Sequence, residues 1–166
     1  NLHGHRRVWI PLSASGFSSL FHDALQLLHA TFVERPDAIL LLGVSGAWAL
    51  PLCRLLRPGT RIVCNVDGLE WRRDKFGIGA RRLLKWLEGV AVRHSHEVIA
   101  DNAALVPLVE TAHGVTPQMI AYGGDHILSN EGDTQQRKDM QGHALTIARI
   151  EPENNTAMIL EAAAAS

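Results

Sequence analysis

Short apolar runs alternate with longer amphipathic segments along most of this chain. Each run has the length of a strand, and each segment between two runs has the apolar spacing of a helix. The four clearest runs are Ala38–Leu42, Arg61–Cys64, Glu97–Ala100 and Pro117–Tyr122. Strands that alternate with helices form crossover units on a parallel sheet. The sequence therefore predicts an α/β fold, a Rossmann-like parallel sheet with flanking helices.

The same reasoning predicts one further strand and several helices. Arg6–Ile10 has the composition of a short strand, and a helix is expected from about residue 13 to residue 32. Further helices are expected at about 47–57, 77–95 and 103–112. Gly114 is expected to be a left-handed cap after the last of them. Because Ala38–Leu42 is apolar throughout, we expect that strand to be buried on both faces of the sheet.

The segment 77–95 is the most clearly amphipathic. At 100° per residue its apolar side holds Leu83, Leu84, Trp86, Leu87, Val90 and Ala91. The opposite side holds Arg81, Arg82, Lys85, Glu88 and Arg93. We therefore expect Trp86 in the core and Glu88 in solvent. His113, beside the Gly114 cap, is expected to be an ordinary histidine at a helix end.

The regular alternation stops after residue 126. Ile127–His143 is polar and charged, which is typical of a linker or mobile loop. A strand at Ala144–Ala148 and a helix at Asn155–Ala165 then restart the pattern. One strand and one helix cannot bury a core alone. We therefore divide the chain into domain 1–126, linker 127–143 and the first unit of a second domain, 144–166. The given sequence does not begin with methionine and ends on a helical run, so we expect it to be a fragment of a longer protein.

Composition excludes some classes of protein. The 166 residues carry a net charge of −1, so no overall charge favours nucleic acid or a membrane surface. Cys53 and Cys64 both lie in apolar runs, which favours buried free thiols in a reducing compartment. No apolar run approaches the ~20 residues that a bilayer requires.

The stretch Asn65–Trp71 is the leading candidate site, because it leaves a strand at its carboxyl end. Asp67, Glu70 and Trp71 could orient hydroxyl groups, bind a metal or act as acid and base. The competing interpretation is a turn with solvated carboxylates. A basic cluster follows from Arg72 onward; it suits a diphosphate or anionic headgroups, or simply the solvated face of a helix.

Other motifs leave alternatives open. Gly43–Ala47 fits a nucleophile elbow with Ser45, for which Asp101 or Asp125 and His126 or His143 would complete a serine hydrolase. The same residues are also what a tight turn uses. Arg149, before a helix start, suits either a diphosphate site or an ordinary helix cap. His94 and His96 have no neighbouring ligands, so no metal and no cofactor are expected.

Four motifs occur in order: Asn65–Arg73, Val98–Asp101, Ile120–Asp125 and Ala148–Asn155. Together they resemble the family-4 glycosyltransferases of GT-B fold, in particular the rhamnosyltransferase-like branch of bacterial surface polysaccharide synthesis. The resemblance covers most of the chain from Pro36 onward. It implies a two-domain architecture in which 1–126 belongs to the amino-terminal, acceptor-side domain and 144–166 begins the donor-side domain. A fragment of this kind is expected to be inactive alone.

The resemblance also implies roles for residues. Asp67 falls where many members carry a histidine at the reacting centre, so it is the catalytic candidate. Glu70, Trp71 and Arg72 are expected to bind the acceptor together with Asp67. The donor would be bound by Arg149, Glu153, Asn154, Gly123 and Asp125. Asn154 replaces the lysine that many members have, which puts half of the usual cationic clamp in doubt.

The expected activity is transfer of a sugar, such as rhamnosyl, from a nucleotide-sugar such as dTDP-rhamnose. The expected acceptor is a glycan or a polyprenyl-linked glycan, and nucleic acid is not an expected partner. The location would be cytoplasmic, with peripheral contact at the inner membrane face, and the uncovered strand 144–148 suggests a homo-oligomer. The alternatives are the Ser45 hydrolase and a non-catalytic module that binds nucleotide-sugars.

Overall fold

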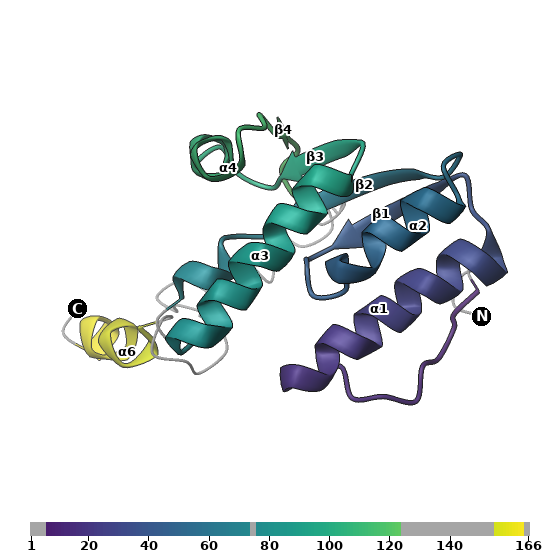
Figure 1. Cartoon of the computed structure of the whole chain (residues 1–166). Coiled ribbons are helices and arrows are strands. Elements are labelled where there is room, and N and C mark those ends of the chain that lie inside the picture. Colours follow the sequence, from purple (N-terminus) through teal and green to yellow (C-terminus); the bar gives the residue numbers. More distant parts are fainter. Residues whose placement is uncertain (1–5, 74–75, 124–154, 165–166) are drawn as a thin grey trace, which may run out of the picture. The chain divides into compact units, whose positions relative to one another are not determined.

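The computed structural model describes residues 6–73, 76–123 and 155–164. The chain divides into two compact units, Asn1–Tyr122 and Gly123–Ser166. The first unit contains the sheet and most of the helices (Figure 1). In the second unit one helix is described, α6 (Thr156–Ala164). The predicted linker 127–143 and the predicted strand 144–148 lie outside the described residues.

Four parallel strands form the sheet of the first unit, in the order β1-β2-β3-β4. Their bounds are β1 (Ala38–Leu42), β2 (Arg61–Val66), β3 (Glu97–Ala100) and β4 (Gln118–Met119). The register pairs Leu41 with Cys64 and Cys64 with Val98. The predicted α/β fold with a Rossmann-like parallel sheet is therefore confirmed. β1 and β3 have the predicted bounds. β2 is two residues longer than expected, and β4 is four residues shorter.

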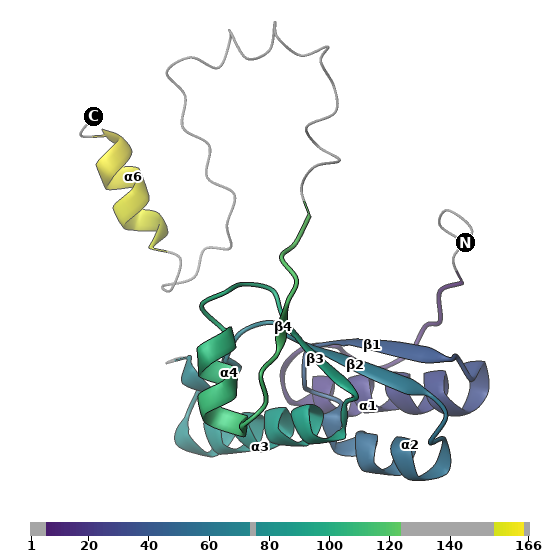
Figure 2. The ribbon, with the colours of Figure 1, turned by 90° about the horizontal axis from the view of Figure 1, so that it is seen from above.

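Helices connect the strands. The short turn η1 (Gly16–Ser18) leads into α1 (Ser19–His29), and a π-helical turn, η2 (Ala30–Glu34), extends it. The other helices are η3 (Ala47–Ala49), α2 (Leu50–Leu56), η4 (Glu70–Arg72), α3 (Ile78–His94) and α4 (Val106–His113). Figure 2 shows α1, α2 and α3 on the same face of the sheet. For α2 and α3 this follows from crossovers of one hand between strands in sequential order. α1 precedes β1 and packs against η3 and α2.

The core lies between that face and the helices. Its members from the strands include Ile62, Cys64, Val66 and Val98, and those from the helices include Leu50, Ala91 and Val109. On the opposite face, Leu40 and Leu42 of β1 are 58% and 76% exposed. The prediction that β1 is buried on both faces is therefore wrong, because its helices cover only one face.

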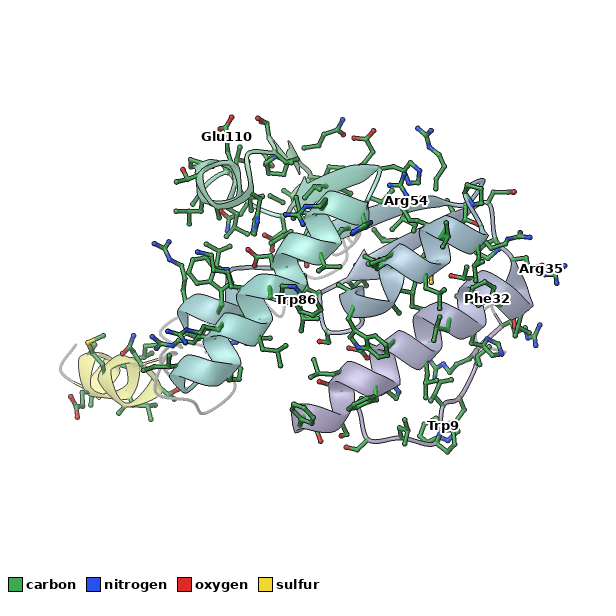
Figure 3. The ribbon with its side chains drawn as sticks, viewed as in Figure 1. Trp9, Phe32, Arg35, Arg54, Trp86 and Glu110 are labelled. Carbon is green, nitrogen blue, oxygen red and sulfur yellow. The ribbon has the colours of Figure 1, made fainter. Side chains whose placement is uncertain are left out.

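Two other predictions are wrong. Arg6–Ile10 pairs with none of the described strands; instead, Arg6 Nη1 donates a hydrogen bond to Glu34 Oε2 (2.9 Å). The predicted helix 77–95 is present as α3, but two of its residues are exchanged between core and solvent. Trp86 is 56% exposed (Figure 3), whereas Glu88 is only 1% exposed. The side of α3 that carries Glu88 faces His113 of α4, so it is covered.

No helix in the described part of the chain has both the length and the apolar character needed to cross a membrane. The longest described helix is α3, whose first half carries several cations. Gly114 ends α4 with a φ of 70°, so the predicted left-handed cap is confirmed.

Candidate functional site

The stretch Asn65–Trp71 leaves β2 at the carboxyl edge of the sheet. Gly68 has a φ of 101°, a conformation that glycine adopts without steric cost, and it turns the chain after Asp67. Leu69 then packs into the core and fixes the start of η4. Leu69 is thus a buried anchor between two acids: Asp67, before it, is exposed, and Glu70, after it, is half-buried.

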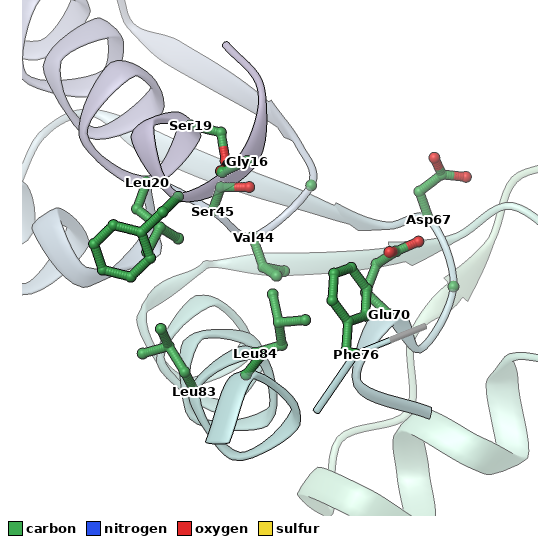
Figure 4. Close-up of a pocket in the computed structure, with 14 residues that line it drawn as sticks. Gly16, Ser19, Leu20, Val44, Ser45, Asp67, Glu70, Phe76, Leu83 and Leu84 are labelled. Carbon is green, nitrogen blue, oxygen red and sulfur yellow. Dashed lines mark hydrogen bonds between the residues drawn. The ribbon is translucent and has the colours of Figure 1, made fainter. Parts of the chain in front are cut away.

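A cleft of about 560 Å³ opens beside this stretch. Asp67 and Glu70 lie on one side of it, and Ser19 and Ser45 lie across from them (Figure 4). The rest of the lining is mainly apolar and comes from η1, α1, the loop after β1, Phe76 just before α3, and the first half of α3. Its apolar members are Phe17, Leu20, Val44, Phe76, Ala80, Leu83 and Leu84. The cleft therefore combines a polar rim with an apolar wall.

The two carboxylates of the cleft have different partners. Arg73 Nη1 donates a hydrogen bond to Glu70 Oε1 (3.0 Å), so Glu70 is part of an ion pair. Asp67 Oδ1 accepts a hydrogen bond from the Tyr122 hydroxyl (3.3 Å), which in turn accepts one from Asn65 Nδ2 (3.3 Å). Among the described residues no cation pairs with Asp67. Asp67 is thus the carboxylate with more capacity to accept a ligand hydroxyl.

Trp71 and Arg72 line a different hollow. We call it the Trp71 groove; it has a volume of about 450 Å³ and is lined by Trp71, Arg72, Ile78, Arg81, Arg82 and Lys85. The indole N–H of Trp71 donates a hydrogen bond to Glu88 Oε1 (3.0 Å), and Glu88 is not among the residues that line the cleft. The four residues predicted to bind an acceptor are therefore distributed between two neighbouring hollows. That they bind an acceptor stays a prediction.

The buried Glu88 carboxylate is a feature that sequence reasoning missed. Its Oε1 lies 2.6 Å from His113 Nε2 of α4, and the same oxygen accepts the Trp71 indole N–H. The side chains of Glu88 and His113 are 1% and 9% exposed. One buried acid therefore connects η4, α3 and α4 beneath the Trp71 groove. The available signal was the position of Glu88 at the border of the apolar side of α3.

The serine hydrolase alternative gains no geometric support. Ser45 lines the cleft, but no described histidine forms a hydrogen bond with it. A nucleophile elbow would hold its serine in a strained conformation, but in this turn the positive φ is at Gly43 (103°) and not at Ser45. Asp101 follows β3, while Asp125, His126 and His143 lie outside the described residues.

Of the three histidines expected to have ordinary roles at helix ends, His113 differs, because it is largely buried against Glu88, whereas His94 and His96 lie at the end of α3 as expected. His96 Nδ1 accepts the backbone N–H of Ile62 (2.9 Å) and thereby holds β2 beside the end of α3. Partial burial, followed by the charges of Arg54 and Arg93, lowers the pKa of His94. Among the described residues no group of three metal-ligating side chains is assembled.

Both cysteines are free and buried, as predicted. Burial, and then the Glu88 carboxylate, raises the pKa of the Cys64 thiol to about 12. Burial also raises the pKa of Cys53. Neither thiol is therefore a thiolate nucleophile at neutral pH.

The predicted donor-binding residues are mostly beyond the described structure. Gly123 follows the end of β4 and is exposed. Asp125, Arg149, Glu153 and Asn154 lie outside the described residues, so the structure says nothing about the proposed donor site.

Comparison with known proteins gives one family. The family described as Domain of unknown function (DUF1972), a domain found in glycosyltransferase-associated proteins, matches residues 21–125. No curated protein matches the chain. The matched range contains all four strands, the carboxylates of the cleft and the whole Trp71 groove. Because it covers more than half of the 166 residues, the chain belongs to the DUF1972 family.

Proposed function

We propose that this chain forms the acceptor side of a glycosyltransferase of GT-B fold and family 4, of the rhamnosyltransferase-like branch. One observation carries the proposal: Asp67 and Glu70 line the same cleft at the carboxyl edge of a parallel sheet. Ligands of open α/β sheets bind at that edge. Membership of a domain family found in glycosyltransferase-associated proteins supports the same assignment.

The proposed reaction is the transfer of a sugar from a nucleotide-sugar, such as dTDP-rhamnose, to an acceptor hydroxyl. Asp67 accepts a hydrogen bond from that hydroxyl and takes up its proton as the oxygen attacks the anomeric carbon. The bond between the anomeric carbon and the phosphate oxygen breaks, and the nucleoside diphosphate leaves with the bonding electrons. Tyr122, which donates to Asp67 Oδ1 (3.3 Å), holds the carboxylate in position.

The wall of the cleft favours an acceptor with apolar surface. Phe17, Phe76 and Leu83 are within reach of a molecule whose hydroxyls bind Asp67 and Glu70. Pockets that bind small molecules combine such apolar walls with a few polar groups that fix orientation. A polyprenyl-linked glycan has both kinds of surface, so we favour it over a fully polar acceptor. Such a substrate fits the proposed location at the cytoplasmic face of the inner membrane.

For the donor we propose Arg149 as the group that binds the diphosphate, with Glu153, Asn154, Gly123 and Asp125 around it. An arginine presents a planar fork of donors to phosphate oxygens, and charge on the leaving diphosphate increases in the transition state. The cleft then supplies the acceptor half of the site, and domain closure brings the two halves together.

The proposal predicts a specific defect for Asp67→Asn. In the natural full-length protein this change keeps the size of the side chain but removes the proton acceptor, so turnover should fall by about 10²–10⁴-fold. Asp37→Asn is the matched control, because Asp37 is exposed at the start of β1, remote in the fold from the cleft lining. The measurement is the rate of nucleoside diphosphate release with an acceptor present. Full turnover by a correctly folded Asp67→Asn protein would remove Asp67 from the mechanism.

A further inference from the structure

The described lining of the Trp71 groove is strongly basic and contains no acid. Four of the six described residues that line it are the cations Arg72, Arg81, Arg82 and Lys85, and none of these six residues is a carboxylate. Within the described ranges, no ion pair joins Arg72, Arg82 or Lys85 to a carboxylate. Like charges held close together repel one another unless an anion lies between them. The groove therefore has the electrostatics of an anion-binding site.

The cations converge because of their positions in the chain. Ile78, Arg81, Arg82 and Lys85 occupy positions i, i+3, i+4 and i+7 of α3, so they share one face of the helix. Arg72 comes from η4, which lies against that face. The groove is thus made by two elements whose relative position is set by the fold, rather than by one flexible loop.

Trp71 forms a fixed wall for these cations. Lys85 Nζ lies 4.7 Å and Arg72 Cζ lies 5.6 Å from the centre of the Trp71 ring, both within cation–π distance. The indole N–H is held by Glu88 Oε1 (3.0 Å), and Glu88 is held by His113. Because Glu88 is buried, this anchoring hydrogen bond is shielded from water. The aromatic wall is therefore preorganised before any ligand arrives.

We propose that the Trp71 groove binds a phosphate-bearing ligand. Guanidinium groups match phosphate oxygens in pairs, and an ammonium supplies a further donor. A volume of about 450 Å³ admits a diphosphate together with part of the group attached to it, which Ile78 and the Trp71 ring can contact. The proposal does not rest on glycosyl transfer, since it requires only the charges and the shape of this groove.

A solvated helix face is the ordinary alternative for such a charge cluster. A solvated face is usually convex and needs no aromatic wall. Here the cations surround a hollow, and one wall is a tryptophan whose N–H group is already occupied by a buried carboxylate. Arg93, an exposed cation further along the same helix, lines a separate hollow of about 240 Å³, whose described lining contains no tryptophan and no other arginine or lysine.

The test uses two sources of phosphate with the whole chain. Binding of inorganic pyrophosphate is measured by titration calorimetry, and binding to phosphatidylcholine vesicles with and without phosphatidylglycerol is measured by sedimentation. The variant combines Arg82→Ala and Lys85→Ala, two exposed side chains, and Arg93→Ala is the matched control on α3. Circular dichroism and urea unfolding verify that each variant is folded.

We expect the double variant to lose at least tenfold in affinity and the Arg93→Ala control to bind like the unmodified chain. Binding of pyrophosphate identifies a soluble phosphate compound as the ligand class. Binding only to vesicles that contain phosphatidylglycerol identifies a lipid headgroup. Failure to bind either probe overturns the proposal, and so does equal binding by the double variant or an equal loss in Arg93→Ala.

Discussion

At the scale of single residues, Glu88 has the most unusual environment among the described residues. It is a carboxylate with 1% exposure, and one of its oxygens contacts both Trp71 Nε1 (3.0 Å) and His113 Nε2 (2.6 Å). A buried acid is tolerated only when its partners replace the hydrogen bonds of water. His113 of α4 and Trp71 of η4 provide that replacement, so the cost of burial is offset by contacts that join three elements.

Replacing Glu88 should therefore be costly. Glu88→Ala removes the acceptor for two partly buried donors, and we expect the free energy of unfolding to fall by about 3 kcal/mol. Glu88→Gln keeps an oxygen at the same place and should lose about 1 kcal/mol. Urea unfolding of the three proteins measures the difference. A loss below about 0.5 kcal/mol for Glu88→Ala, which is typical of surface sites, would contradict the role assigned to Glu88.

The Cys64 thiol predicts a dependence of stability on pH. Its pKa rises from 9.0 to about 12 in the folded protein, mainly because the thiolate would be buried. Above pH 9 the unfolded chain loses this proton and the folded chain keeps it, so stability decreases as pH rises. The expected slope is about −1.4 kcal/mol per pH unit between these two values, and the thiol adds no slope below the lower one.

The slope is isolated by comparing the unmodified chain with Cys64→Ala. Urea unfolding at about pH 8 and about pH 10 should show a larger loss of stability in the unmodified chain, by about 1.4 kcal/mol. Other groups that titrate in this range contribute to both proteins alike. Equal losses in the two proteins would show that the Cys64 thiol is not protected in the folded state.

At the scale of elements, α1 depends on a close approach to the turn after β1. A Cβ atom added to Gly46 would lie 2.7 Å from the backbone carbon of Asp23 and 2.8 Å from the backbone nitrogen of Ala24, both in α1. These atoms belong to helix backbone, so they cannot move aside without shifting α1. Glycine at position 46 therefore sets the distance between α1 and η3.

Gly46→Ala should force the two elements apart and lower the free energy of unfolding by about 1–3 kcal/mol. Gly59→Ala is the matched control, because an added Cβ there has no neighbour within 4 Å and should change stability by less than about 0.5 kcal/mol. Thermal or urea unfolding compares the two. If both variants had the stability of the unmodified chain, the packing of α1 on this turn would be looser than the structure indicates.

The periodicity of α3 was predictable, but its orientation was not. At 100° per residue, Glu88 and Trp86 lie at opposite borders of the apolar side, each about 40° from its nearest apolar neighbour. Residue type alone placed the tryptophan inside and the acid outside. The packing of α4 reverses this, because His113 covers the border that carries Glu88 and leaves Trp86 56% exposed. Which of two such border residues is buried depends on the positions of the neighbouring elements.

Whether a predicted strand forms also depends on neighbouring elements, because a strand requires another strand to pair with. The parallel pairing of β1, β2 and β3 follows from their alternation with helices, and the predicted bounds of β3 are confirmed. Arg6–Ile10 has strand-like composition but pairs with none of the described strands, so composition alone was not sufficient. The exposure of Leu40 and Leu42 arises because the crossovers place the helices on the other face.

At the scale of the whole molecule, the sheet edge explains how much of the candidate site could be predicted. The carboxyl ends of parallel strands meet at one edge, so a carboxylate after β2 was expected to face a ligand site. Asp67, Glu70 and Ser45 line a cleft at that edge, and that the cleft binds a ligand stays a prediction. Its apolar wall and the separate Trp71 groove could not be predicted, because they depend on how α1, η4 and α3 approach one another.

The most direct test of the central claim, glycosyl transfer, is the stoichiometry of the reaction. The natural full-length protein is incubated with nucleotide-sugars and lipid-linked glycan acceptors, and nucleoside diphosphate and glycosylated product are measured in the same sample by mass spectrometry. The account predicts one nucleoside diphosphate released for each sugar added to the acceptor, with both signals lost together in Asp67→Asn. Binding of nucleotide-sugar without release, or release without a glycosylated product, would contradict it.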